Sequence, residues 1–333
     1  MLAVVAATRP RLVTFDATGT LMRVQRPVGA IYRDALISSL SASKLARTAD
    51  LSAAELAACN VDPVAIGRAF GRAYAAQCAA HPCFGAGSLS SRDWWSSVVR
   101  EAFVGAGVSE AVVRAEMPLL FPTLYESFAS TATWELLDAS AGVVQQLARW
   151  RAQLPPGELT IGVISNFDDR LPALLNSLGL GRYFDFVLTS REHGDEKPCR
   201  SIFERASERA GLATVDVSPR TCVHVGDTFG TDVLGASRAG WRAVFVASDD
   251  ALGELMPEAF VAMAETEHER IPSLGFVPRI VGAPAATALP PRDGSDDGLS
   301  DDDADSEDDP HADELDDDGE RAWFEGLRDK EAK

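Results

Sequence analysis

The chain has 333 residues, 46% of them hydrophobic, and a mean hydropathy close to zero, so it can bury a large core in more than one folded unit. Its formal net charge is −19, but sixteen of the Asp and Glu lie in residues 293–320, which contain no Lys or Arg, and the remainder carries only −3. This composition argues against a nucleic-acid-binding surface, and no apolar run approaches the ~20 residues of a membrane span.

The first predicted element is a short apolar strand at residues 12–15, in the stretch "RLVTFDATGTL", which ends abruptly at Asp16. Residues 23–131 follow it and show only helical patterns, at 28–40, 62–80, 91–107 and 109–128. Trp94, Trp95 and Phe103 fall in this segment and are predicted to form its core. An all-helical insert therefore separates the first strand from the rest of the chain.

An alternation of strands and helices resumes near Trp134. Strands are predicted at 159–165, 221–226 and 243–247, with a weaker one at 183–190, and helices at 140–153, 169–180 and 200–212. Near-continuous apolar strands indicate a sheet covered on both faces. The pattern predicts an α/β domain with a doubly wound parallel sheet.

The acidic segment at 284–333 is too polar and too highly charged to fold, and we predict that it is disordered. Its last residues, "ERAWFEGLRDKEAK", place Trp323, Phe324 and Leu327 on one side of a possible short helix, a candidate docking element for a protein partner. Truncation after Ala283 is expected to leave the cooperative thermal melt nearly unchanged. A large loss of stability would show instead that the segment packs on the core.

Polar residues mark the ends of several predicted strands and the start of one helix. In an open α/β sheet the carboxyl ends of the strands form the ligand crevice. A single Asp at such a position is commonly a helix N-cap, but several reactive groups in this order favour a catalytic site. The candidates are Asp16, Ser165, Asn166, Lys197, Asp227 and Asp232.

These residue types suit phosphoryl transfer through a covalent aspartyl intermediate. Asp16 is the candidate nucleophile, and Asp16, Asp227 and Asp232 are candidate Mg²⁺ ligands, because Mg²⁺ prefers carboxylates, carbonyls and water. Ser165, with Asn166, is placed to bind a phosphoryl oxygen. Lys197 is placed to bind the phosphate, neutralise developing charge and steady Asp16.

The four motifs that carry these residues resemble those of the haloacid dehalogenase superfamily and stand in the same order. The resemblance covers residues 11 to about 275. It implies a Rossmann-like core at 11–22 and 132–280, a helical cap at 23–131, Mg²⁺ dependence and mainly phosphatase chemistry. The motif stretches are "FDATGTLMRVQRPVG", "VISNFDDRL", "KPCRSIF" and "HVGDTFGTDVLGASRAG".

Thr18 departs from the pattern of fast phosphatases in this superfamily, which usually have Asp at that position. That Asp protonates the leaving oxygen and then activates water, a contribution of ~10²–10⁴-fold for positioned acid–base catalysis. A threonine hydroxyl has a pKa too high for this role, although the Thr18 carbonyl can still be a metal ligand. The P-type ATPases also resemble this loop, with Asp-x-Thr-Gly-Thr, and they use a phosphoenzyme that is not discharged by the residue at that position.

Two functions remain open from the sequence. The first is a Mg²⁺-dependent phosphatase, slowed by Thr18, that acts on a small phosphorylated metabolite. The second is a catalytically weak or inactive binding or regulatory protein that uses its acidic segment to contact partners.

Other features of the sequence lead to further expectations. The five scattered cysteines predict no disulfide framework, and the N-terminal apolar run is too short for a signal peptide. We therefore predict a cytoplasmic protein, with an organelle or the nucleus left open. His224, on the strand at 221–226, is predicted to be a hydrogen-bonded core residue rather than a catalytic base.

Overall fold

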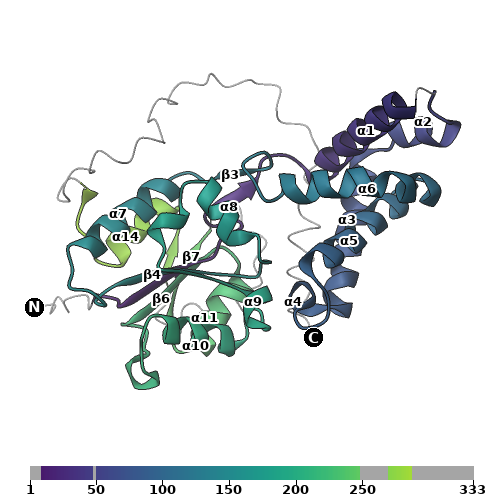
Figure 1. Cartoon of the computed structure of the whole chain (residues 1–333). Coiled ribbons are helices and arrows are strands. Elements are labelled where there is room, and N and C mark those ends of the chain that lie inside the picture. The colour runs from purple at the N-terminus through teal and green to yellow at the C-terminus, as the bar shows by residue number, and fades with distance from the viewer. Residues whose placement is uncertain (1–8, 48–49, 248–268, 287–333) are drawn as a thin grey trace, which may run out of the picture. The chain divides into compact units, whose positions relative to one another are not determined.

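The computed structural model describes residues 9–47, 50–247 and 269–286. The predictions made for residues 287–333 lie outside this range. The described residues divide into two compact units, labelled by element in Figure 1: an α/β unit up to Arg23 and from Glu135 onward, and a helical unit at Val24–Trp134. Within the described ranges, no helix has the length and apolar character needed to cross a membrane.

The α/β unit is built on one six-stranded sheet in the order β5-β4-β1-β6-β7-β8, and every neighbouring pair is parallel. The chain runs outward from β1 to β5 and then returns to the other side of β1 at β6. This confirms the predicted doubly wound sheet and places its topological switch point at β1. The strands are β1 Leu12–Phe15, β4 Thr160–Ser165, β5 Phe186–Thr189, β6 Cys222–Gly226, β7 Arg242–Val246 and β8 Glu269–Ile271.

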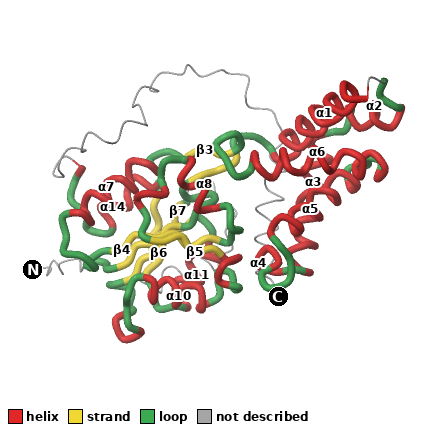
Figure 2. The backbone as a smooth tube through the Cα atoms, viewed as in Figure 1, coloured by secondary structure: helices red, strands yellow, loops and turns green. Residues whose placement is uncertain are grey.

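Helices cover both faces of this sheet, as the tube in Figure 2 shows. One face carries α7 Ser140–Ala152, α8 Leu171–Ser177 and α14 Val277–Ile280, and the other carries α9 Ser190–His193, α10 Arg200–Arg209 and α11 Leu234–Arg238. The two-sided cover explains why β1 is buried at all four positions. Alternate residues of a strand point to opposite faces, so apolar residues are needed at every position.

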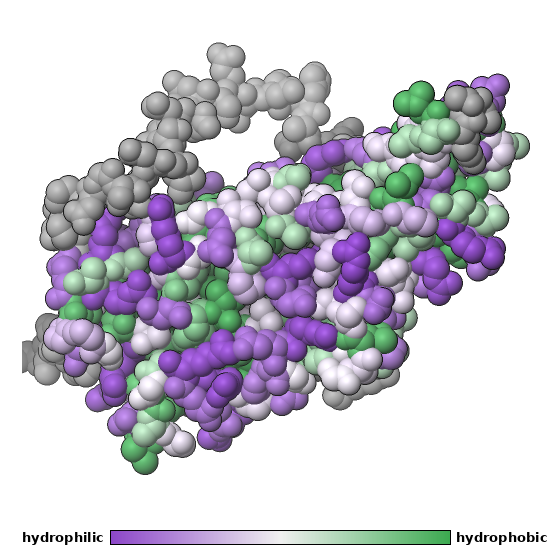
Figure 3. Space-filling view, viewed as in Figure 1, coloured by the Kyte–Doolittle hydropathy of each residue, from purple (hydrophilic) through white to green (hydrophobic). Residues whose placement is uncertain are grey.

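Helix α10 illustrates how the sequence selects these faces. Ile202, Phe203 and Ala206 are buried, because their spacing places them on one side of the helix. The outward side pairs Arg200 with Glu204 and Arg205 with Glu208, and Figure 3 shows hydrophilic residues gathered over this part of the surface.

The helical unit contains α1 Val28–Arg47, α2 Ala53–Cys59, α3 Pro63–Ala80, α4 Pro82–Gly85, α5 Ser91–Gly105 and α6 Glu110–Ser127. Its core confirms the predicted aromatic cluster, since Trp94 and Phe103 are fully buried and the partly buried Trp95 packs against this core and contacts Trp94. Helix α6 continues through Pro118 and Pro122. Two short strands, β2 Met22–Val24 and β3 Trp134–Leu136, pair where the chain passes from one unit to the other.

Candidate active site

Three of the predicted site residues meet at the carboxyl edge of the sheet. Asp16 follows β1, Ser165 ends β4 and Asp227 follows β6. These strands are neighbours, and Phe15 pairs in register with Val163 on one side and Val225 on the other. The parallel register therefore brings side chains from three distant parts of the sequence to one edge, at the switch point.

Lys197 completes the cluster from the loop before α10. Its ammonium donates to Asp16 Oδ1 over 2.7 Å and to Asp232 Oδ1 over 2.6 Å. Lys197 is 2% exposed, Asp232 1% and Asp16 8%. An ion pair buried to this degree is held in one arrangement, because each charge would otherwise lack water and a partner.

Asp227 is held by the tight turn that follows Asp16. Gly19 has φ +81°, and a Cβ at Gly19 would lie 2.3 Å from Asp227 Oδ2, so only glycine leaves room for this carboxylate. The hydroxyl of Thr20 donates to Asp227 Oδ1 over 2.7 Å. Nothing in the sequence singles out Thr20, because its partner Asp227 lies far away in the chain.

The site contains more negative charge than Lys197 balances. Burial and the neighbouring carboxylates of Asp16 and Asp232 raise the pKa of Asp227 from 3.8 to about 8. Burial also leaves the pKa of Asp16 raised, although Lys197 opposes this. Burial lowers the pKa of Lys197, but the carboxylates of Asp16 and Asp232 outweigh it and leave the pKa raised.

Three carboxylates lie close enough to share a cation. Oxygens of Asp16, Asp227 and Asp232 are all within 4.8 Å of one another. Asp16 and Asp232 are buried and Asp227 is half-buried, and their ligand atoms are hard oxygens, so the residues fit Mg²⁺. A divalent cation would remove the repulsion that raises the pKa of Asp227.

Asp232 is less available to a metal than the sequence suggested. Its Oδ1 accepts hydrogen bonds from Lys197 and from His224 Nε2, and its Oδ2 accepts the backbone N–H of Thr228 over 2.9 Å. The carboxylate lies on a π-helical turn, Phe229–Val233, which places it over Gly226. Burial raises the pKa of Asp232, but Lys197 and then His224 hold it well below its usual value. These contacts favour a role in fixing Lys197, and metal binding by Asp232 stays a prediction.

Asn166 has a contact that the sequence did not reveal. Its side-chain Nδ2 donates to the Lys197 carbonyl over 2.9 Å, and its Oδ1 accepts the Lys197 backbone N–H over 2.8 Å. The amide therefore fixes the backbone that carries the ammonium. The predicted contact of Asn166 with phosphate stays a prediction, since these two bonds already engage both polar atoms of the side chain.

Asn166→Ala is expected to lower the turnover of phosphate esters, the substrates expected from the sequence, by about 10-fold. This is the lower end for losing a residue that orients a reactive group. The Lys197 backbone would lose both hydrogen bonds, and the ammonium would be less well placed. Asn176→Ala, on α8, is the matched control for removing an amide elsewhere in this unit. Equal activity in the two variants would contradict the positioning role of Asn166.

Ser165 and Thr18 have hydroxyls that remain available. Ser165 is 2% exposed at the last position of β4, and Thr18 is half-buried in the turn. Among the described residues, neither side chain takes part in a hydrogen bond. The Ser165 hydroxyl is therefore free to meet an anion near Asp16, and Thr18 occupies the loop position predicted for an acid without offering a carboxyl group.

Asp227 is expected to make the metal-free protein lose stability as pH rises from about 4 to about 8. In this range folded Asp227, with its pKa of about 8, holds a proton that the unfolded chain releases. The folded state then binds more protons, so the free energy of unfolding falls with pH, by up to ~1.4 kcal/mol per pH unit for such a group. Thermal melts in a chelator measure the slope. The slope of stability against pH should become flatter in Asp227→Asn and in the presence of Mg²⁺. An unchanged slope in both cases would contradict the excess of negative charge in the site.

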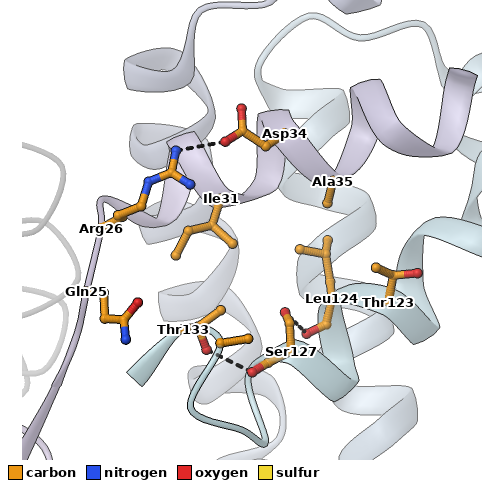
Figure 4. Close-up of a pocket in the computed structure, with 10 residues that line it drawn as sticks. Gln25, Arg26, Ile31, Asp34, Ala35, Thr123, Leu124, Ser127 and Thr133 are labelled. Atoms are coloured by element: carbon orange, nitrogen blue, oxygen red, sulfur yellow. Dashed lines mark hydrogen bonds and ion pairs between the residues drawn. The ribbon is translucent and has the colours of Figure 1, made fainter. Parts of the chain in front are cut away.

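A separate pocket of about 200 Å³ lies inside the helical unit. Figure 4 shows Ile31, Ala35 and Leu124 facing it, with Arg26 and Asp34 paired at 2.7 Å. The Ser127 and Thr133 hydroxyls already donate to backbone carbonyls. None of the predicted chemical groups lines this pocket, so the sheet edge is the stronger candidate for the active site.

Comparisons with known proteins agree with this geometry. The family model described as haloacid dehalogenase-like hydrolase matches residues 10–240. Haloacid dehalogenase-like hydrolase domain-containing protein 3 of Bos taurus is 35% identical over 243 residues, which are 73% of this chain and 84% of that protein. The 5-amino-6-(5-phospho-D-ribitylamino)uracil phosphatase YigB of Escherichia coli (strain K12) is 31% identical over 130 residues, 36% of this chain and 52% of that protein.

A solved structure shows the fold independently of close sequence similarity. The crystal structure of a dehalogenase with an intermediate complex has a TM-score of 0.52 and 15% identity, covering 83% of this chain and 99% of that chain. The sheet order, the strand-end residues and the family match over most of the α/β unit all agree. The chain therefore belongs to the haloacid dehalogenase-like hydrolase family.

Proposed function

We propose that this hydrolase is a Mg²⁺-dependent phosphatase that acts on a small phosphorylated metabolite through an aspartyl-phosphate intermediate. The observation that carries the proposal is the buried contact between Lys197 and Asp16 beside a second carboxylate, Asp227, which has no ion-pair partner among the described residues. This arrangement supports a nucleophile held in place by a cation. YigB, which matches part of the chain, is by its name a phosphatase and adds support.

The proposed reaction has two steps. An Asp16 carboxylate oxygen forms a bond to phosphorus while the bond from phosphorus to the ester oxygen breaks. The departing alkoxide takes its proton from solvent, because Thr18 has no acidic group to supply it. Water then attacks phosphorus, the bond to Asp16 breaks, and inorganic phosphate is released.

The remaining residues would bind and orient the phosphoryl group. Ser165 donates to a phosphoryl oxygen, and Lys197 stabilises the negative charge as it spreads over those oxygens. Asp16, Asp227 and the Thr18 carbonyl would hold Mg²⁺, whose contribution is to screen the repulsion between the carboxylate and the phosphate. The helical unit, as a cap, would select the substrate.

Phosphate release from a general chromogenic phosphate ester, with and without Mg²⁺, tests the proposal. A panel of phosphorylated metabolites follows to identify the substrate. We expect slow, Mg²⁺-dependent release that is absent in Asp16→Asn, because an amide cannot form the acyl phosphate. Release that is independent of both would contradict the proposal and leave the alternative, a binding or regulatory protein whose acidic segment contacts partners. The cytoplasmic location of this protein stays a prediction.

A further inference from the structure

A row of buried, hydrogen-bonded polar side chains leads to Lys197 through Asp232. Thr14 Oγ1 lies 2.8 Å from His224 Nδ1, and His224 Nε2 lies 3.1 Å from Asp232 Oδ1. Asp232 Oδ1 in turn accepts from the Lys197 ammonium. Thr14 and His224 are both completely buried, on neighbouring strands β1 and β6.

The donors and acceptors along this row favour one tautomer of His224. Asp232 is a carboxylate and only accepts, so the nitrogen that faces it, Nε2, must carry a proton. In a neutral ring Nδ1 is then an acceptor, and Thr14 Oγ1 must donate to it. The other possible acceptor for this hydroxyl, the Val223 carbonyl, lies farther away at 3.4 Å.

The surroundings keep the ring in this orientation and disfavour its charged form. Phe203 meets the imidazole edge-on at 90°, with ring centroids 5.3 Å apart. Burial lowers the pKa of His224, and the Lys197 ammonium adds to this effect. The Asp232 carboxylate opposes the shift but leaves the pKa lowered.

We propose that Thr14 and His224 are positioning residues for Lys197: the Thr14 hydroxyl fixes the Nε2–H tautomer of His224, which holds the Asp232 carboxylate against the Lys197 ammonium. Asp232 Oδ1 then accepts hydrogen bonds from two donors, His224 on β6 and Lys197 in the loop before α10. Because the Lys197 ammonium contacts Asp16 as well, these buried side chains determine where the ammonium meets Asp16, the candidate nucleophile.

The tautomer is measured directly on the whole chain by NMR. The sequence has only five histidines and four lysines, so ¹⁵N labelling of these residue types gives simple spectra, assigned by loss of signals in His224→Gln and Lys197→Met. We expect Nε2–H and a bare Nδ1 on His224, and a slowly exchanging Lys197 ammonium, since Lys197 is 2% exposed. A proton on Nδ1, alone or together with Nε2–H, would overturn the proposal.

Variants of Thr14 test the hydrogen bonds that link Thr14, His224, Asp232 and Lys197. Thr14→Val keeps the shape and β-branching of the side chain but removes the hydroxyl, and should give mixed His224 tautomers and a shifted Lys197 ammonium signal. Thr14→Ser, which restores the hydroxyl, should restore both signals. Val223→Ala, a loss of buried atoms from the neighbouring residue of β6, should lower stability and leave both signals in place. Unchanged signals in Thr14→Val would overturn the proposal.

A kinetic measurement extends the test and rests on the proposed phosphatase activity. Thr14→Val should lower kcat by about 10-fold, as for supporting partners of reactive groups, with KM little changed, and Thr14→Ser should recover most of the loss. An unchanged kcat would overturn the role in positioning Lys197. If wild type releases no phosphate, the proposed function fails, while the two NMR signals still decide the inference.

Discussion

Replacing Thr18 by Asp is expected to raise phosphate release by as much as ~10²-fold, the lower end for positioned acid–base catalysis. Lys197 already meets Asp16 at 2.7 Å, and Asp227 is held by Thr20 and by the turn at Gly19. The new carboxyl group would supply the proton that the leaving oxygen lacks and then activate water. Steady-state rates on a broad panel of phosphate esters measure the gain.

Two control variants make this result interpretable. Thr18→Asn has nearly the same size and polarity as Thr18→Asp without the acid, and should give no gain. Asp16→Asn combined with Thr18→Asp should abolish it. We would abandon the proposed phosphatase if Thr18→Asp remained inactive on the whole panel and no phosphoenzyme could be trapped.

Replacing Lys197 by Met is expected to destabilise the folded protein by about 3–5 kcal/mol in the absence of metal, the usual cost of removing one partner of a buried ion pair. The ammonium contacts both Asp16 and Asp232, and Met would leave both carboxylates buried without their cation. Urea unfolding, followed by circular dichroism, measures the loss. Activity should be lost as well, because no other described side chain donates to Asp16.

Lys44→Met is the matched control for Lys197→Met. Lys44 lies 3.5 Å from Asp50, with 49% of its side chain exposed, and such surface pairs contribute ~0–1 kcal/mol. Adding Asp232→Asn to Lys197→Met should recover part of the lost stability, because it removes one uncompensated charge. Equal losses of stability in Lys197→Met and Lys44→Met would contradict the claim that the Lys197 ammonium balances the charge of the buried carboxylates.

The sequence was sufficient to predict the parallel sheet and the place of the site. Short, near-continuous apolar runs favour strands covered on both faces, so β1, β4, β6 and β7 were predictable, and their carboxyl ends located Asp16, Ser165 and Asp227. The edge strand β8 was missed, because "ERI" carries two charged residues in three positions. Helix α2 was missed because its seven residues give too short a pattern.

The hydrogen-bond partners within the site could not be predicted from the sequence. Asn166 lies beside Ser165 in the chain, and a phosphate contact is the natural expectation, yet its amide binds the Lys197 backbone. His224 was expected to be a hydrogen-bonded core residue, and it is, but its link to Asp232 depends on the π-helical turn at Phe229–Val233. Such contacts depend on loop geometry, which residue types and spacing do not specify.

Trapping the phosphoenzyme tests the role of Asp16 most directly. The full-length protein is incubated with Mg²⁺ and a substrate identified on the panel, quenched in acid, digested and examined by mass spectrometry. We expect one phosphoryl group on Asp16, stable in acid, removed by hydroxylamine and absent from Asp16→Asn, with more accumulating in wild type than in Thr18→Asp. Turnover of that substrate without any label on Asp16, or with the label on another residue, would contradict the aspartyl-phosphate mechanism.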